Sequence, residues 1–224
     1  MKKYLLDIWL GITFVLVGVA NYLVFLYVPN ERVMGPVQRI FYFHVGSAFA
    51  CYCSVATMLI AGLWYLATHE KKWDALQAAA GEVGFVFCTV TLVSGMIWAK
   101  SAWNTAFSWR EPRLVSFLCL WLIFAGFSML RRFGDRQRIG AHSAVLSILG
   151  AITVPIVVYS VKFLPHTGQL HPVVVENGGL TDVRFQIVFW FCNVTLVIFQ
   201  FVLLALRCRV AKLEREAENL ETFL

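Results

Sequence analysis

Residues 185–206 read FQIVFWFCNVTLVIFQFVLLAL and contain no charged side chain. A helix that crosses the hydrocarbon core of a bilayer needs roughly 20 mostly apolar residues, and this stretch has that length and composition. Its apolar runs 187–191 and 194–199 do not alternate with polar positions. The strands of a membrane β-barrel alternate over about 10 residues, so the barrel is excluded. The stretch therefore predicts a membrane-spanning helix.

Five further stretches have the same character. They lie at about 8–28, 40–67, 77–98, 114–130 and 142–163. The first is longer than the apolar region of a signal peptide and no small-x-small site follows it, so we expect it to remain as a span. The sequence thus predicts an all-α, polytopic membrane protein with six transmembrane helices, organised as a transmembrane domain over 1–206 and a cytoplasmic helical tail over 207–224.

The composition supports this class. Hydrophobic residues make up 59% of the 224 residues and charged residues only 14%, with a mean hydropathy of +0.71. Soluble domains carry about 25% charged residues, so an ordinary cytosolic enzyme and a disordered chain are excluded. The six cysteines form neither a C-x-x-C nor a C-x-x-C-H motif, which excludes a thiol oxidoreductase and a c-type cytochrome. We expect the cysteines to pack between helices.

The basic residues predict the orientation of the chain. If the N-terminus is cytoplasmic, twelve of the 19 Lys and Arg residues lie inside and seven outside, as positively charged inner loops require. Six spans then leave both termini in the cytoplasm. The seven outer residues are Arg32, Arg39, Lys100, Arg110, Arg113, Lys162 and Arg184. So many cations on the outer side indicate an anionic ligand there.

Histidines gather on the same predicted outer side. His44 lies near the outer end of the second span, close to Arg39, and ionisable groups within spans are functional candidates by default. His166 and His171 lie in the third outer loop, where either is placed to face His44. Two imidazoles at one membrane face indicate a bis-histidine metal or haem site.

The second outer segment is rich in aromatic residues. Trp98, Trp103, Phe107 and Trp109 occur there among Lys100, Arg110 and Arg113. One interpretation is an interfacial aromatic belt. The other is an aromatic shelf for a planar ligand, with cations for its carboxylates. Combined with the histidines, the second interpretation predicts a planar, iron-bearing dicarboxylate, and haem meets all three conditions.

Three segments resemble a known family. These are Gln38–Val45 (QRIFYFHV), the region from Glu82-Val83-Gly84 to 94–100 (SGMIWAK), and the region from 159–162 (YSVK) to Leu170-His171-Pro172. They are similar to the CcmC/CcsA haem-handling proteins of cytochrome c maturation, and most closely to the CcmC type. The six-span layout agrees, so the resemblance extends over nearly the whole chain.

The resemblance implies a site and partners. It implies that His44 and His171 are axial ligands of a transiently bound b-type haem, which the segment 98–114 holds at the outer face. Arg39 and Arg113 are the candidates to pair with the propionates. The chain would be no enzyme. It would lie in the bacterial inner membrane and pass haem to a CcmE-like periplasmic chaperone, with an ABC-transporter complex and a small membrane subunit as further partners.

The aromatic segment departs from the family pattern W-G-x-W-W-x-W-D-x-R-L. Asn104 replaces the glycine, Ala106-Phe107 replaces the central tryptophan pair, and the acidic position is Glu111.

Two other classes of protein stay open. An electron-transfer subunit of the cytochrome b type would use histidines at both leaflets, and His69 and His142 lie at inner ends. An assembly or transporter subunit would bind no cofactor.

Two further features are predicted to be structural. Glu82 is an acid inside the third span, so we expect it to face the bundle and to be paired or protonated. In the tail, apolar residues recur at spacings of three and four from Val210 to Leu224. This pattern covers barely two heptads and fits either a helical extension of the sixth span or a docking helix for a partner.

Overall fold

The computed structural model describes residues 2–135, 137–163, 180 and 182–221. Its regular elements within these ranges are helices. The elements are α1 (Lys2–Tyr22), a π-helical turn η1 (Leu23–Tyr27), a 3-10 turn η2 (Pro36–Arg39), α2 (Ile40–Thr68), α3 (Lys71–Trp103), α4 (Pro112–Phe133), α5 (Ile139–Phe163) and α6 (Val183–Glu221).

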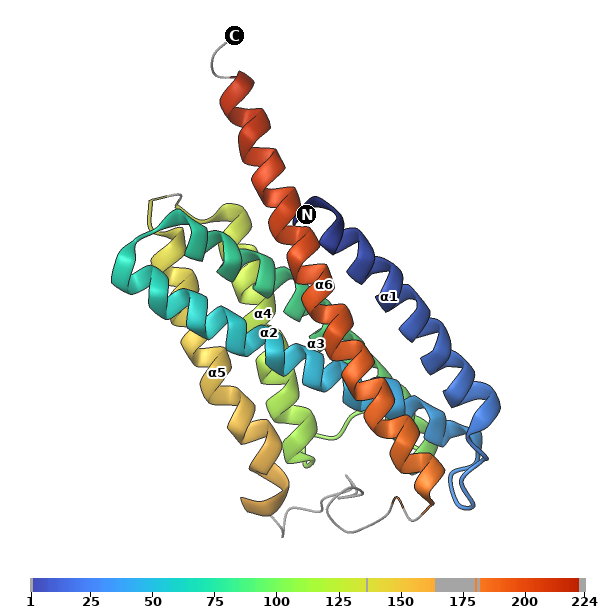
Figure 1. Ribbon diagram of the computed structural model, residues 1–224. Coiled ribbons are helices and arrows are strands. Elements are labelled where there is room, and N and C mark those ends of the chain that lie inside the picture. Colours follow the sequence, from blue (N-terminus) through green and yellow to red (C-terminus); the bar gives the residue numbers. More distant parts are fainter. Residues whose placement is uncertain (1, 136, 164–179, 181, 222–224) are drawn as a thin grey trace.

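The six predicted spans are confirmed as helices. Six helical segments in the described ranges are long and apolar enough to cross a membrane, and each contains one predicted stretch or nearly all of it. Several extend further, because polar residues continue the helix beyond the apolar run: α3 begins at Lys71, ahead of the predicted start at 77. Helix α1 begins and helix α6 ends at the same end of the bundle, which is the end that carries the termini (Figure 1). We call the opposite end, where α1 leads into α2 and α3 into α4, the His44 end.

Helix α2 is central in the bundle. It packs against α3, α5 and α6, while α4 packs against α3 and α5. Helix α1 lies at one edge beside α6, and α5 lies at the opposite edge (Figure 1). The side chains of α1 therefore face largely outward, and Phe14 is 82% exposed. In a bilayer this surface contacts lipid.

Small residues allow α3 and α4 to approach closely. A Cβ atom added at Gly81 would lie 2.2 Å from the ring of Phe127, and one at Gly84 would lie 2.6 Å from the ring of Phe124. Both rings are buried. Helices in lipid associate through van der Waals packing and interhelical hydrogen bonds, and small residues improve the packing because they let the backbones approach closely.

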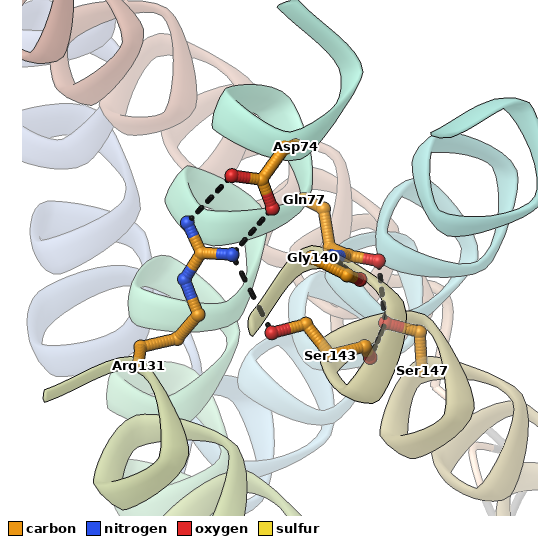
Figure 2. A network of polar contacts seen from close by, with 6 residues as sticks. All are labelled: Asp74, Gln77, Arg131, Gly140, Ser143 and Ser147. Carbon is orange, nitrogen blue, oxygen red and sulfur yellow. Dashed lines mark hydrogen bonds and ion pairs between the residues drawn. The ribbon is translucent and has the colours of Figure 1, made fainter. Parts of the chain in front are cut away.

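A polar network joins three helices at the end that carries the termini (Figure 2). Arg131 of α4 pairs with Asp74 of α3 at N–O distances of 2.5 and 3.2 Å, and donates to the hydroxyl of Ser143 on α5 at 3.4 Å. Gln77 of α3 donates to the carbonyl of Gly140 on α5 at 3.3 Å. The network satisfies polar groups that would otherwise be costly to bury.

Glu82 pairs as predicted, although it is not enclosed by the bundle. Arg207 of α6 donates to its two carboxylate oxygens at 2.5 and 3.0 Å. The Glu82 side chain is half exposed. Beyond this pair α6 continues without a break to Glu221, and its side chains from Arg209 onward are exposed except for half-buried Ala211. The described part of the tail is thus a helical extension of the sixth span.

Candidate functional site

A cavity of about 220 Å³ lies among α2, α3, α4 and α5 towards the His44 end. Its walls are mostly apolar and aromatic, with a few polar side chains. The lining residues are His44, Val45, Ala48, Phe49, Tyr52, Thr91, Leu92, Gly95, Trp98, Trp103, Arg113, Leu114, Phe117, Val157 and Val158. Such a combination of apolar walls and a few convergent polar groups is typical of ligand sites.

Helical periodicity gathers these side chains from distant parts of the chain. On α2, His44 and Tyr52 fall on one face because they lie eight positions apart, about two turns. On α3, Thr91, Gly95 and Trp98 are spaced by four and three positions and share a face in the same way. The packing of α2 against α3 turns both faces towards the same space.

The hydrogen bonds of His44 define its tautomer. Its Nδ1 lies 3.1 Å from the carbonyl oxygen of Thr91 and 3.1 Å from the hydroxyl of Ser94. A carbonyl only accepts, so Nδ1 carries the proton and Nε2 of the neutral ring keeps a lone pair. Within the described ranges no side chain or backbone group hydrogen-bonds to Nε2. A ring whose Nδ1–H is held by a backbone carbonyl is the usual arrangement of a metal-binding histidine.

Gly95 provides the space for this ring, a role that no motif in the sequence indicates. A Cβ atom there would lie 2.9 Å from Cε1 of His44, closer than real Cβ contacts allow. Thr91 and Gly95 both lie in or near the segment that resembles the family. Their link to His44 depends on how α2 packs against α3, which no local pattern reveals.

The predicted aromatic segment divides into two pairs. Trp98 and Trp103 line the cavity and meet edge to face, with ring centroids 5.0 Å apart. Phe107 and Trp109 form a second edge-to-face pair at 5.1 Å, and neither lines the cavity. The chain turns between the pairs at Asn104, whose φ of +57° lies in the left-handed region and ends α3. The structure thus brings two of the four predicted aromatic residues together with His44.

The two arginines predicted to pair with the propionates lie in different places. Arg113, in the first turn of α4, lines the cavity and donates to the carbonyl of Val158 at 3.3 Å. Arg39 lies in the 3-10 turn η2 and donates to the side-chain oxygen of Asn30 at 3.1 Å. It does not line the cavity. His171, the predicted second ligand, and its alternative His166 lie outside the described residues.

The loop before η2 is held by one carboxylate. The backbone N–H groups of Met34 and Val33 donate to Glu31 at 2.6 and 2.8 Å. The bond from Met34 is the main reason that the pKa of Glu31 lies below its ordinary value; burial acts in the opposite direction, and the bond from Val33 lowers the pKa further. Gly35, with a φ of +57°, then turns the chain into η2. This fixed turn leads directly into the segment that carries Arg39 and His44.

Six helices long and apolar enough to cross a membrane, with a cavity near one end that is lined by aromatic residues and His44, define a class: polytopic helical membrane proteins with a pocket towards one end of the bundle. The sequence profile of the CcmC family, described as "Heme exporter protein C", matches residues 1–222. The chain therefore belongs to the CcmC family, and the expected resemblance is confirmed.

Individual relatives agree with this assignment. The "Heme exporter protein C" of Bradyrhizobium diazoefficiens is 31% identical over 160 residues, which is 71% of this chain and 60% of that protein. The protein of the same name in Escherichia coli K12 is 31% identical over 157 residues, 69% of this chain and 64% of that protein. The one in Paracoccus denitrificans is 31% identical over 137 residues. The chain thus spans less than two thirds of the length of these relatives.

Proposed function

We propose that this chain binds haem at its His44 end and hands it to a periplasmic haem chaperone of the CcmE type during cytochrome c maturation. Membership of the CcmC family supports haem as the cargo. The observation that carries the proposal is the fixed tautomer of His44, whose Nε2 is left as a ligand beside a cavity lined by aromatic residues and Arg113.

The residues present fit haem in three respects. His44 would supply one ligand to the haem iron through Nε2, and His171 is the proposed second ligand. Trp98 and Trp103 supply aromatic surface for the tetrapyrrole. Arg113 supplies a cation for a propionate, with Arg39 as the candidate for the other. Phe107 and Trp109 do not line the cavity, so their assignment to the haem rests on the resemblance alone.

The size of the cavity favours a temporary holding site. Sites that enclose a drug-sized ligand measure roughly 300–1,000 Å³. The cavity measures about 220 Å³, so it encloses only part of a tetrapyrrole and leaves the rest at the mouth. A ligand that stays partly outside is accessible to a chaperone. No bond within the haem is made or broken by this chain in the proposal.

The proposal includes an orientation in the bacterial inner membrane. Both termini lie at one end of the bundle, which supports placing them in the same compartment (Figure 1). The surplus of Lys and Arg on that side supports a cytoplasmic location for it and a periplasmic location for the His44 end. An ABC-transporter complex and a small membrane subunit are the further proposed partners, and residues 207–224 form the proposed cytoplasmic tail.

The hand-over is tested by a transfer assay. The purified chain is loaded with haem in detergent and mixed with a purified periplasmic haem chaperone, and the two proteins are then separated. We expect haem to appear in the chaperone fraction. Haem that stays with the chain, or that reaches an unrelated haem-binding protein equally fast, would contradict the proposed role.

The second ligand is tested by single substitutions of the loop histidines. His171→Ala is expected to remove the six-coordinate low-spin absorption spectrum, while His166→Ala leaves it nearly unchanged. The reverse result would reassign the ligand to His166. Unchanged spectra in both variants would remove the bis-histidine coordination from the proposal.

A further inference from the structure

A second hollow lies between α4 and α5, on the side of these helices that faces away from the His44 cavity. It is an open groove of about 790 Å³. The groove is lined by Trp109, Arg110, Pro112, Val115, Ser116, Cys119, Pro155, Ile156, Tyr159 and Ser160. The cavity instead uses neighbouring positions of the same helices, among them Leu114, Phe117 and Val157. The α4–α5 contact therefore separates the two spaces.

The wall of the groove is apolar in effect. Its two serines donate their hydroxyl protons within their own helices: Ser116 to the carbonyl of Pro112 at 2.7 Å and Ser160 to the carbonyl of Val157 at 2.9 Å. Ile156 is 54% exposed, and Cys119 is also exposed. A hydrocarbon chain is the natural occupant of such a surface within a bilayer.

The depth of the groove matches part of one leaflet. From Pro112 to Cys119 the groove follows α4 for about 10 Å, at 1.5 Å per residue. The hydrocarbon core of a bilayer is roughly 30 Å thick, so one leaflet contributes about 15 Å. A membrane-spanning partner helix would need a contact surface along most of the full thickness. The groove is too short for such a helix and long enough for the upper part of an acyl chain.

A cation lies at the mouth of the groove. Arg110, in the turn before α4, is exposed, and no ion-pair partner for it occurs in the described part of the chain. Trp109 beside it is 76% exposed. Tryptophan and arginine at the end of a spanning segment mark the level of the lipid headgroups. A phosphate at this level would meet the guanidinium directly.

We propose that the groove binds an anionic phospholipid from the leaflet at the His44 end, with one acyl chain between α4 and α5 and the headgroup phosphate on Arg110. The groove shares no lining residue with the His44 cavity, so either proposal can fail without the other. Val157 and Val158 line the cavity while their neighbour Ile156 lines the groove. The bound lipid would therefore support the wall of the cavity from behind.

Cys119 is a built-in reporter for this lipid. It is exposed in the groove, whereas Cys51, Cys88 and Cys192 are buried. The full chain is reconstituted in vesicles of phosphatidylcholine alone or with added phosphatidylglycerol. A bilayer-soluble maleimide is applied, and labelling of the Cys119 peptide is followed by mass spectrometry. Arg110→Gln removes the proposed phosphate contact. Arg32→Gln, at an exposed cation of the same end outside the groove, is the matched control.

We expect phosphatidylglycerol to slow the labelling of Cys119 about fivefold in the unaltered chain and in Arg32→Gln. A factor of this size corresponds to the attraction between one basic residue and an anionic lipid surface. Arg110→Gln should lose this dependence. The proposal would be overturned if the labelling rate of Cys119 were the same with and without phosphatidylglycerol. It would also be overturned if phosphatidylglycerol still protected Cys119 in Arg110→Gln. Protection in purified complexes that is independent of lipid would assign the groove to a protein partner and would overturn it as well. Thermal unfolding of each variant in detergent checks that the fold is intact.

Discussion

A single backbone carbonyl, that of Thr91, decides which nitrogen of His44 carries the proton. The 3.1 Å contact directs Nδ1–H into α3 and leaves Nε2 available. Gly95, one turn further along α3, keeps the space in which the imidazole lies. At this scale the site depends on a carbonyl and a missing side chain as much as on the histidine itself.

The first prediction concerns Gly95. Gly95→Ala places a methyl group 2.9 Å from the ring of His44, so the ring must turn away from Thr91. Overpacking of this kind costs typically 1–3 kcal/mol, and we expect haem retention to fall about tenfold or more. Haem titration followed by absorption measures it. Gly126→Ala on α4, where no atom lies within 4 Å of the added group, is the control and should bind haem normally. Equal affinities in the two variants would contradict the role of Gly95.

The second prediction concerns pH. The pKa of Glu31 is lowered from 4.5 in the folded loop, so its contribution to loop order is present above pH 4.5 and is lost as the pH falls through the folded value. Amide exchange at Met34 should therefore be slow near neutral pH and should accelerate below pH 4.5 relative to a reference amide in α3. Glu31→Gln should show no such acceleration. An identical pH profile in that variant would exclude the carboxylate as the cause.

Residues of the candidate site could be predicted from the sequence where the chemistry of the side chain itself suggests ligand binding. His44, Trp98, Trp103 and Arg113 stand out in the sequence, and the structure gathers all four around one cavity. Thr91 was not predictable, because its role belongs to its carbonyl and to the packing of α3 against α2. For the same reason, the sequence could not tell that Arg39 and Trp109 lie away from the cavity.

At the scale of helices, polar contacts set how the elements meet. On α6, Asn193, Gln200, Arg207 and Glu214 are spaced by seven positions and so fall near one face. Gln200 donates to Ser54 of α2 at 3.0 Å, and Arg207 donates to Glu82 of α3. Polar contacts between membrane helices are worth little individually, about 0.6 kcal/mol on average. The two contacts that Gln200 and Arg207 make, seven positions apart on α6, oppose sliding or rotation of this helix against α2 and α3.

The third prediction concerns the network in Figure 2. Arg131→Gln leaves Asp74 without its cation, and both side chains of the pair are less than one quarter exposed. We expect a loss of about 1–3 kcal/mol of stability, below the cost for a fully buried pair. Urea or thermal unfolding in detergent measures it. The double variant Asp74→Asn with Arg131→Gln should recover part of the loss, whereas strictly additive effects would contradict a direct coupling.

At the scale of the whole molecule, the number of spans was predictable because span length and apolarity are local properties. The exact bounds were not, since α3 begins as a helix in its polar flank at Lys71, ahead of the predicted start at 77. The cavity was not predictable as a shape, because it depends on how four helices pack. The predicted pairing of His44 with His171 remains a prediction, since His171 lies outside the described residues.

The fourth prediction is the topology of the chain. Reporter fusions after Lys72 and after Arg138 should indicate a cytoplasmic location. Fusions within 100–110 and 168–180 should indicate a periplasmic location. The surplus of positive charge at the end with the termini is the physical reason. A fusion on the opposite side at any one of the four positions would contradict the six-span orientation.

The most direct test of the central claim is the absorption spectrum of haem bound to the purified chain. His44→Ala is compared with His142→Ala, an exposed histidine of α5 near the end that carries the termini. The account predicts that His44→Ala loses the six-coordinate low-spin spectrum and most of the bound haem, while His142→Ala keeps both. An unchanged spectrum in His44→Ala, or a haem lost in His142→Ala, would contradict a haem site built on His44.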